Sequence, residues 1–276
     1  MFTPHSLILL FSFLLANLFF ASASAPFPHL PKRQNSTTPP DLTPSFTPSE
    51  LYALQKRLWD NFLFPADVVQ AESINSTLLA SDCQGRIDIT RNFDGGELNT
   101  EYLFGLFATL AANPNELSLI GVPLTYDIIH FSAQEYISSA ATRFLFNLTS
   151  VGLVIPVEID TWIAWNGDGE IQQYDATFKY WSWLMDYVLT TIAPALGANS
   201  STQAMQILTP ALANSICTTE EQFCLGDNQQ YASKDACVAF LTQNVRFGQA
   251  FEMGQDTIMC RSIHQNMVPY RPSVHW

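Results

Sequence analysis

The spacing of apolar residues predicts helices where the folded part of the chain begins. A Thr-Pro-Ser-Glu sequence at 47–50 has the form of a capping box with proline in the first helical turn. Apolar residues then recur at helical spacing: Leu51, Leu54, Leu58 and Phe62. We predict a first helix from residue 48, a short second helix over 65–74, and a buried helix over 97–111.

The period changes from helix to strand in the middle of the chain. Between 153 and 165 apolar residues alternate with polar ones, which is the pattern of a long antiparallel strand. Asn-Gly-Asp-Gly at 166–169 predicts a tight turn, and 171–180 returns as the partner strand. Three further strands are predicted: 85–89, 122–131 and 135–146. Together the long strands form a meander.

Helical periodicity returns after the strands. We predict helices over 181–195, over 202–216 with a kink at Pro210, and over 234–244 with Ser233 as the N-cap. The aromatic residues at the junction between strand and helix are expected to lie in the core: Phe178, Tyr180, Trp181 and Trp183.

The order of these elements predicts an α+β fold. N-terminal helices and a curved, cone-like antiparallel sheet occupy residues 48–195, and a helical extension that contains cysteines occupies 196–276. Residues 34–47 are rich in threonine, proline and serine and lack apolar periodicity, which predicts a disordered linker.

The N-terminus has the pattern of a secretory signal peptide. An uncharged apolar run from Leu7 to Phe20 leads into small residues, and it is too short for a stable membrane span. We predict that the signal peptide is residues 1–23, because cleavage after Ala25 would place Pro26 next to the scissile bond.

A dibasic pair follows the signal peptide. Lys32 and Arg33 resemble a kexin-type processing site, so that residues 24–33 form a propeptide. The alternative is that the two basic residues are adjacent in a linker by chance and are not a processing site. Signal peptide and dibasic site together resemble those of secreted fungal proteins, and we expect an extracellular location. Four sequons support glycosylation on that route: Asn35, Asn75, Asn147 and Asn199.

Net charge excludes two classes of partner. Twelve basic residues stand against twenty-five acidic ones, for a formal charge of −13. Nucleic acid and anionic membranes bind through clusters of lysine and arginine, so we expect neither as a partner. The oligomeric state stays open, with a dimer as one alternative.

The cysteines divide the chain unevenly. Cys83 stands alone, as a buried free thiol or bonded to an unseen partner. In an oxidising compartment the other four predict two disulfides, with all three pairings open: Cys217, Cys224, Cys237 and Cys260. Their spacings lack the tight pairs of a zinc site. His264 with Met267 is a weak signal for copper, and we expect no metal and no cofactor.

Helices followed by a meander of long strands resemble the nuclear-transport-factor-two-like (SnoaL-like) cone of polyketide cyclases, ketosteroid isomerases and scytalone dehydratases. The stretch that carries the resemblance is Ile-Asp-Thr-Trp-Ile-Ala-Trp-Asn-Gly-Asp-Gly-Glu-Ile at 159–171. The resemblance covers roughly residues 48–181 and implies a cavity inside the cone. The segments 84–88 and 260–264 and the cysteine-bearing tail have no counterpart in those enzymes, and no catalytic residue carries over.

Two residues are the best candidates for a general base in such a cone. His130 lies on a predicted strand with Tyr126 on the same face and Asp127 on the other. Asp160 shares a strand face with Glu158, about 7 Å away, close enough to raise the pKa of one carboxyl if the pair is buried. The alternatives are a hydrogen-bonded strand histidine and a solvent-facing carboxylate pair, and the alternation favours solvent.

The same strands supply candidates for a ligand pocket. Trp162 would form an aromatic wall beside Asp160, and Tyr174 on the returning strand and Tyr126 would add hydroxyl groups. Two functions follow: binding of a small apolar molecule, or action as an extracellular factor. The alternative is a cofactor-free isomerase, cyclase or dehydratase with Asp160 or His130 as the base.

Overall fold

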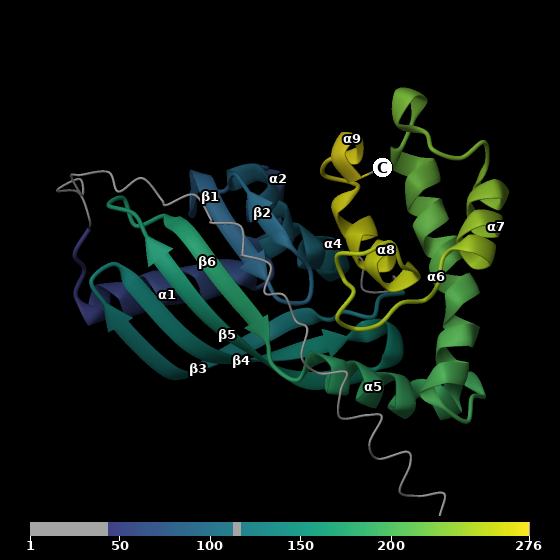
Figure 1. The fold of residues 1–276 in the computed structure, drawn as a ribbon, viewed down its shortest axis with the longest axis horizontal. Helices are drawn as coiled ribbons and strands as arrows, with labels where there is room; N and C mark the ends of the chain where they lie inside the picture. Colours follow the sequence, from purple (N-terminus) through teal and green to yellow (C-terminus); the bar gives the residue numbers. More distant parts are fainter. Residues whose placement is uncertain (1–43, 113–116, 276) are drawn as a thin grey trace, which may run out of the picture. The chain divides into compact units, whose positions relative to one another are not determined.

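A six-stranded sheet in the order β2-β1-β6-β5-β4-β3 organises the fold (Figure 1). This computed structural model describes residues 44–112 and 117–275, all within one unit. The predicted signal peptide, propeptide, Lys32, Arg33 and Asn35 lie outside the described residues, as does the linker up to residue 43.

Four strands form an antiparallel meander, as the sequence predicts, and two more extend it beside β6. The strands are β1 (Leu79–Ile87), β2 (Asn92–Asp94), β3 (Val122–Gln134), β4 (Ile137–Leu148), β5 (Leu153–Trp165) and β6 (Ile171–Phe178). β1 pairs with β6 in parallel, and short β2 pairs with β1 in antiparallel. The short strand that we predicted over 85–89 therefore begins earlier and joins the main sheet.

The predicted N-terminal helices are all present, and one contains an irregular turn. They are α1 (Pro48–Phe62), α2 (Ala66–Glu72), α3 (Gly96–Thr100) and α4 (Leu106–Ala112). Thr47 caps α1 through the predicted capping box. Between α3 and α4 the chain forms a π turn, Glu101–Gly105, so the helix predicted over 97–111 is interrupted.

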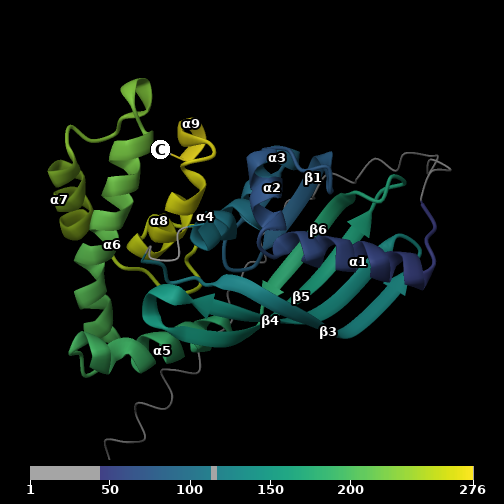
Figure 2. The ribbon, with the colours of Figure 1, turned by 180° about the vertical axis from the view of Figure 1, so that it is seen from behind.

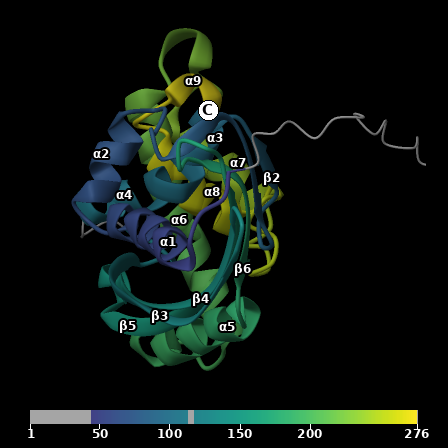
Figure 3. The same cartoon turned by 90° about the vertical axis from the view of Figure 1, so that its left-hand side faces the viewer.

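Alternate residues of the long strands face α1, around which the sheet curves (Figures 2 and 3). We call this the inner face and the opposite one the outer face. On the inner face the Phe144 ring meets the rings of Trp59 and Phe62 edge to face, at centroid distances of 4.9 and 5.3 Å. The Trp59 indole N–H donates to Thr142 at 3.1 Å. The apolar residues of each strand thus specify which face is buried.

The described C-terminal helices lie at one end of the sheet: α5 (Trp181–Ile192), α6 (Ser201–Phe223), α7 (Lys234–Asn244), α8 (Ile258–His264) and α9 (Pro272–His275) (Figure 1). Pro210 lies inside α6, and Ser233 caps α7 as predicted. The prediction of an α+β fold with a helical, disulfide-bonded extension is confirmed. The boundary predicted at residue 195 falls within a short 3-10 turn, Ala193–Leu196.

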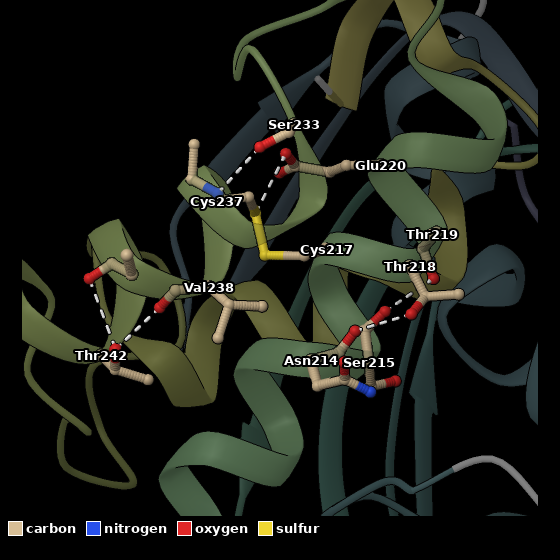
Figure 4. The surroundings of a disulfide bond; sticks show 12 residues. Asn214, Ser215, Cys217, Thr218, Thr219, Glu220, Ser233, Cys237, Val238 and Thr242 are labelled. Atoms are coloured by element: carbon tan, nitrogen blue, oxygen red, sulfur yellow. Dashed lines mark hydrogen bonds between the residues drawn. A yellow bond between two sulfur atoms is a disulfide. The ribbon is translucent and has the colours of Figure 1, made fainter.

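One disulfide joins the helices of the extension, where we predicted two. Cys217 of α6 is bonded to Cys237 of α7 (Figure 4). Cys224 and Cys260 are buried free thiols, so the prediction of a second disulfide is wrong for them. The reason is their placement: Cys224 ends α6, whereas the Cys260 sulfur lies 3.1 Å from His264 Nδ1. Cys83 is a buried free thiol, the first of its two alternatives.

Asp67 of α2 is fully buried, and its Oδ2 atom makes no hydrogen bond to any residue that the structure describes. Burial raises the pKa of this carboxyl to about 6, whereas the amide N–H of Val68 lowers it. The folded state therefore binds the proton more tightly than the unfolded state. The carboxyl favours folding fully below pH 3.8, and this contribution is lost as the pH rises through 6.

We expect Asp67→Asn to raise the free energy of unfolding at pH 8 by about 1–3 kcal/mol. Asparagine has nearly the same shape as aspartate but carries no charge, so the variant no longer buries an ionised carboxylate. At pH 4 the two proteins should be equally stable. Urea unfolding at both pH values checks this. A gain of the same size at pH 4 would contradict the proposed cause.

Candidate functional site

An apolar cavity of about 70 Å³ lies between the inner face of the sheet, the N-terminal helices and the extension. α1 contributes Trp59 and Phe62, and the extension contributes Met253 and Ile263. The remaining lining comes from strands, the π turn, α4, the loop before β3 and the start of α5, and includes Leu106, Leu119, Phe146, Leu148, Ile155, Val157, Ile159, Ala176, Phe178 and Trp181. The cone and the extension together enclose this cavity.

Tyr102 brings an aromatic ring with a hydroxyl group to this apolar wall. It belongs to the π turn, is 4% exposed and lines the cavity. Its ring lies against Phe93, with the centroids 3.8 Å apart. π turns within helices are rare and occur frequently at functional sites.

The hydroxyl group of Tyr102 meets a histidine from the extension. Tyr102 Oη lies 2.8 Å from His264 Nε2. On its other side, His264 Nδ1 lies 2.9 Å from the Cys260 carbonyl oxygen and 3.1 Å from the Cys260 sulfur. Burial lowers the pKa of His264 to about 4 and raises the pKa of Tyr102 to about 12 and that of Cys260 to about 11. All three groups are therefore neutral at physiological pH.

Two arrangements of hydrogen atoms fit this geometry. In the first, Nδ1–H donates to the Cys260 carbonyl group, and Nε2 accepts the hydrogen bond of the Tyr102 hydroxyl. In the second, the Cys260 thiol donates to Nδ1, Nε2–H donates to Tyr102, and the Tyr102 hydroxyl is released from His264 as a donor. The two tautomers of the histidine thus make the Tyr102 hydroxyl either a donor to His264 or an acceptor from it.

The extension is fixed to the cone through residues that follow His264 in the chain. Asn266 donates to the Leu106 carbonyl group at 3.1 Å, and its own carbonyl oxygen accepts from Thr109 at 2.6 Å. Glu101, next to Tyr102 in the chain, is buried and pairs with Arg271 at 3.0 Å and with His275 at 2.7 Å. These contacts hold the π turn and α8 in register, which fixes the distance between Tyr102 and His264.

The structure places both predicted bases on the outer face, away from the cavity. His130 and Asp160 line one depression of about 610 Å³ there, together with Glu158 and Lys179. Ala141 lies opposite both, so His130 and Asp160 are two strand spacings apart, about 10 Å. They do not form a hydrogen-bonded pair, and Glu158 pairs with Lys179 at 2.6 Å.

A bulge explains the position of His130. The register of β3 against β4 shifts between Ile128 and His130, and an extra residue reverses the faces that follow it. His130 therefore lies on the outer face, whereas Tyr126 lies on the inner one, and our prediction that they share a face is wrong. Asp127 is paired with Arg143 at 2.9 Å.

The three residues predicted to form a ligand pocket are separated. Tyr126 of β3 contacts two exposed side chains of α1: its hydroxyl donates to Asp60 at 2.5 Å and accepts from Lys56 at 3.0 Å. Trp162 is half-buried on the outer face. Tyr174 lies on the inner face, 3% exposed, and its hydroxyl has no partner in the described chain. Burial raises its pKa well above 10.

The sequons in the described residues differ in exposure. Asn75 and Asn199 are exposed, and Asn199 lies just before the N-cap of α6. Asn147 is half-buried. It lies in β4, where it pairs with Val154 of β5, so it does not lie in a turn.

The aromatic cluster at the start of α5 is divided. Trp181 is buried and Phe178 packs against it, with the ring centroids 5.4 Å apart. Tyr180 and Trp183 are 74% and 67% exposed, so the prediction that they lie in the core is wrong. The ring of Tyr187 stacks on that of Trp183.

The described residues contain neither a cluster of metal ligands nor a membrane-spanning helix. No three histidine, cysteine or acidic side chains converge there in a way that could bind a metal ion. No described helix combines the length and the apolar character needed to cross a bilayer.

Sequence reasoning missed the pair of Tyr102 and His264. The two residues are 162 positions apart, and no sequence motif links them. Two signals were available: a tyrosine inside an otherwise apolar helical face, and the segment 260–264, which has no counterpart in the enzymes that the cone resembles.

Comparisons with known proteins cover almost the whole chain. Residues 56–176 match the BfoA N-terminal domain, and residues 180–276 match the BfoA family C-terminal domain. The chain is 48% identical to the Aurasperone B biosynthesis cluster protein A of Aspergillus niger over 92% of its own length and 82% of that protein. It is 49% identical to the Bifonsecin B biosynthesis cluster protein A of Aspergillus brasiliensis, over 84% and 77%.

Two solved structures are similar at lower levels. One is a putative SnoaL-like polyketide cyclase from Jannaschia sp., with a TM-score of 0.34 and 11% identity, covering 49% of this chain and 90% of that one. The other is an uncharacterized protein with a cystatin-like fold from Silicibacter pomeroyi, with a TM-score of 0.30 and 11% identity, covering 46% and 77%.

Proposed function

Because this chain belongs to the BfoA family, whose two domains it matches in succession, we propose that its cavity acts on a small, largely apolar molecule of the polyketide class. The reaction is a cofactor-free proton transfer that leads to isomerisation, or to cyclisation with loss of water. Two relatives take their names from the biosynthesis clusters of aurasperone B and bifonsecin B, which supports a natural-product substrate.

The observation that carries the proposal is a tyrosine that lines an apolar cavity and whose hydroxyl lies 2.8 Å from a neutral histidine. An apolar wall with few, well-placed polar groups is typical of small-molecule sites. General acid and base groups in such sites must reach the reacting atoms and hold or release a proton at the operating pH.

The hydrogen-bond arrangements described above suggest how the proton moves. A proton leaves an acidic carbon of the substrate for the Tyr102 oxygen, while the hydroxyl proton of Tyr102 passes to His264 Nε2. Return of the proton from His264 through Tyr102 to a carbonyl oxygen of the substrate completes an isomerisation. In a cyclisation, the deprotonated carbon forms a bond to a carbonyl carbon of the same molecule, the C=O π bond breaks, and the oxygen takes the returned proton. Removal of a second proton from the first carbon, with a proton delivered to the new hydroxyl group, breaks the C–O bond and releases water. Atoms and charge balance without an external oxidant or reductant.

The cavity must widen to hold such a molecule. Its volume of about 70 Å³ is roughly half of the ~150 Å³ that holds benzene in an apolar protein cavity. Met253 lies in the wall on a segment, 245–257, that contains no helix or strand. The unbranched, flexible side chain of Met253 makes it the wall residue whose change of rotamer would widen the cavity, while the backbone N–H of Met253 stays bonded to the Ile89 carbonyl group.

The test uses the purified full chain and an extract from a strain of the source organism that lacks this gene. We expect the protein to convert one compound of the extract into a product of equal mass, or of that mass less one water, as measured by chromatography with mass spectrometry. Tyr102→Phe should slow the conversion about 100-fold, which is a typical loss for a general acid or base group.

Tyr126→Phe is the matched control. It removes a tyrosine hydroxyl that is also hydrogen-bonded but lies outside the cavity lining, and its rate should equal that of the unaltered chain. Full activity of Tyr102→Phe would contradict the role of Tyr102. A compound that is retained by the protein but never converted would contradict catalysis and favour binding alone.

A further inference from the structure

A second hollow lies on the outer face of the sheet, on the side opposite the cavity. It has a volume of about 430 Å³, within the range of small-ligand sites. Its floor crosses four neighbouring strands: Trp162 of β5 lies opposite Asp175 of β6, which lies opposite Arg86 of β1, which lies opposite Asn92 of β2. This row spans three strand spacings, about 14 Å.

A second polar row runs beside the first. Gln173 of β6 lies opposite Gln84 of β1, which lies opposite Asp94 of β2. We call the hollow formed by these two rows the outer cleft. Its β1 residues belong to the segment 84–88, which the proposed reaction leaves without a role.

Four side chains of the outer cleft have no partner in the part of the chain that the structure describes. The side chains of Gln84, Asn92, Asp94 and Gln173 are exposed and make no hydrogen bond or ion pair with any other described residue. Three are amides, each of which offers donors and an acceptor in one plane. The cleft therefore presents paired donors and acceptors in a fixed array on the rigid sheet.

The charges of the outer cleft exclude an anionic ligand. Arg86 forms an ion pair with Asp175, so its charge is balanced inside the cleft. Among the described residues that line it, Asp94 is the one charged side chain without an ion-pair partner. A phosphate or carboxylate would meet a net negative site, so the ligand that fits is uncharged and rich in hydroxyl groups.

Trp162 supplies the apolar part of the site. Its indole is half-buried at one end of the row, next to Asp175 in the register. A large aromatic ring with a polar N–H combines an apolar face with a hydrogen-bond donor. The C–H face of a pyranose ring matches such a surface, while its hydroxyl groups match the amides beside it.

We propose that the outer cleft binds a neutral oligosaccharide, with Trp162 against one sugar ring and the side chains of Gln84, Asn92 and Gln173 on its hydroxyl groups. This site is independent of the proposed reaction, because the cleft and the cavity lie on opposite faces of the sheet. Either proposal can therefore fail alone.

The test is isothermal titration of the full chain with three neutral probes: chitotetraose, laminaritetraose and cellotetraose. We expect at least one of them to bind. Trp162→Ala should weaken that binding about tenfold, which is the loss expected for an aromatic contact. Gln173→Ala should weaken it as well, since it removes an amide from the exposed floor without opening the core.

Trp183→Ala is the matched control, because Trp183 is a more exposed tryptophan on α5 that does not line the cleft. It should bind as the unaltered chain does. Loss of binding in Trp183→Ala with retention in Trp162→Ala would place the sugar on α5 and overturn the proposal. Absence of binding to all three probes would overturn it too.

Discussion

Replacing Phe144 with alanine is expected to lower the free energy of unfolding by about 3–5 kcal/mol, the usual cost of removing a buried aromatic ring. Phe144 is fully buried on the inner face of β4. Its ring meets those of Trp59, Phe62 and Phe146, at centroid distances of 4.9, 5.3 and 5.9 Å. The cost is large because α1 and β4 are rigid, so the space cannot close.

Leu145→Ala is the control for this prediction. Leu145 is the next residue of the same strand, but it lies on the outer face and is 40% exposed. Its replacement should change stability by no more than about 0.5 kcal/mol. Urea unfolding followed by tryptophan fluorescence measures both variants. Equal losses at the two positions would mean that the assignment of inner and outer faces is wrong.

Removal of the disulfide is expected to cost about 3 kcal/mol. The bond joins Cys217 and Cys237, which are 20 residues apart, and closing a loop of this length restricts the unfolded chain by that amount in the chain-entropy model. Thermal or urea unfolding of the double variant Cys217→Ala and Cys237→Ala checks the value.

Treatment with a reductant distinguishes this disulfide from the free cysteines. Dithiothreitol should destabilise the unaltered chain and Cys224→Ala alike, because Cys224 is a free thiol. It should leave the double variant unchanged. If Cys224→Ala were insensitive to the reductant, Cys224 would belong to the bond, and the pairing in the structure would be contradicted.

The sequence predicted the elements well because each depends on local periodicity. The alternation in β5 and the capping box at Thr47 identify a strand and a helix start from neighbouring residues alone. The π turn and the bulge in β3 were missed, since each is a single-residue irregularity with no compositional signature. The bulge alone moved His130 to the other face.

The site was harder to predict because its two polar groups are 162 residues apart in the chain. Tyr102 and His264 approach only because Asn266 and Glu101 attach the extension to the cone. Distance in sequence hides such a pair, whereas Asp160 and Trp162 attracted attention by their spacing of two and proved to face outward. The alternation favoured solvent for Asp160. The residue does lie on the outer face, but it is half-buried, and its Oδ1 atom is buried without a hydrogen-bond partner among the described residues.

The parallel pairing of β1 with β6 has a consequence for how the chain folds. Residues 79–87 must wait for 171–178, about ninety positions later, before they gain their main partner. The hairpins of β3, β4, β5 and β6 join neighbours in the chain and can form early, whereas closing the long loop to β1 is slow. We expect the addition of β1, with its neighbour β2, to follow the meander and to limit the folding rate, so that during synthesis the first strand made is the last to join the main sheet.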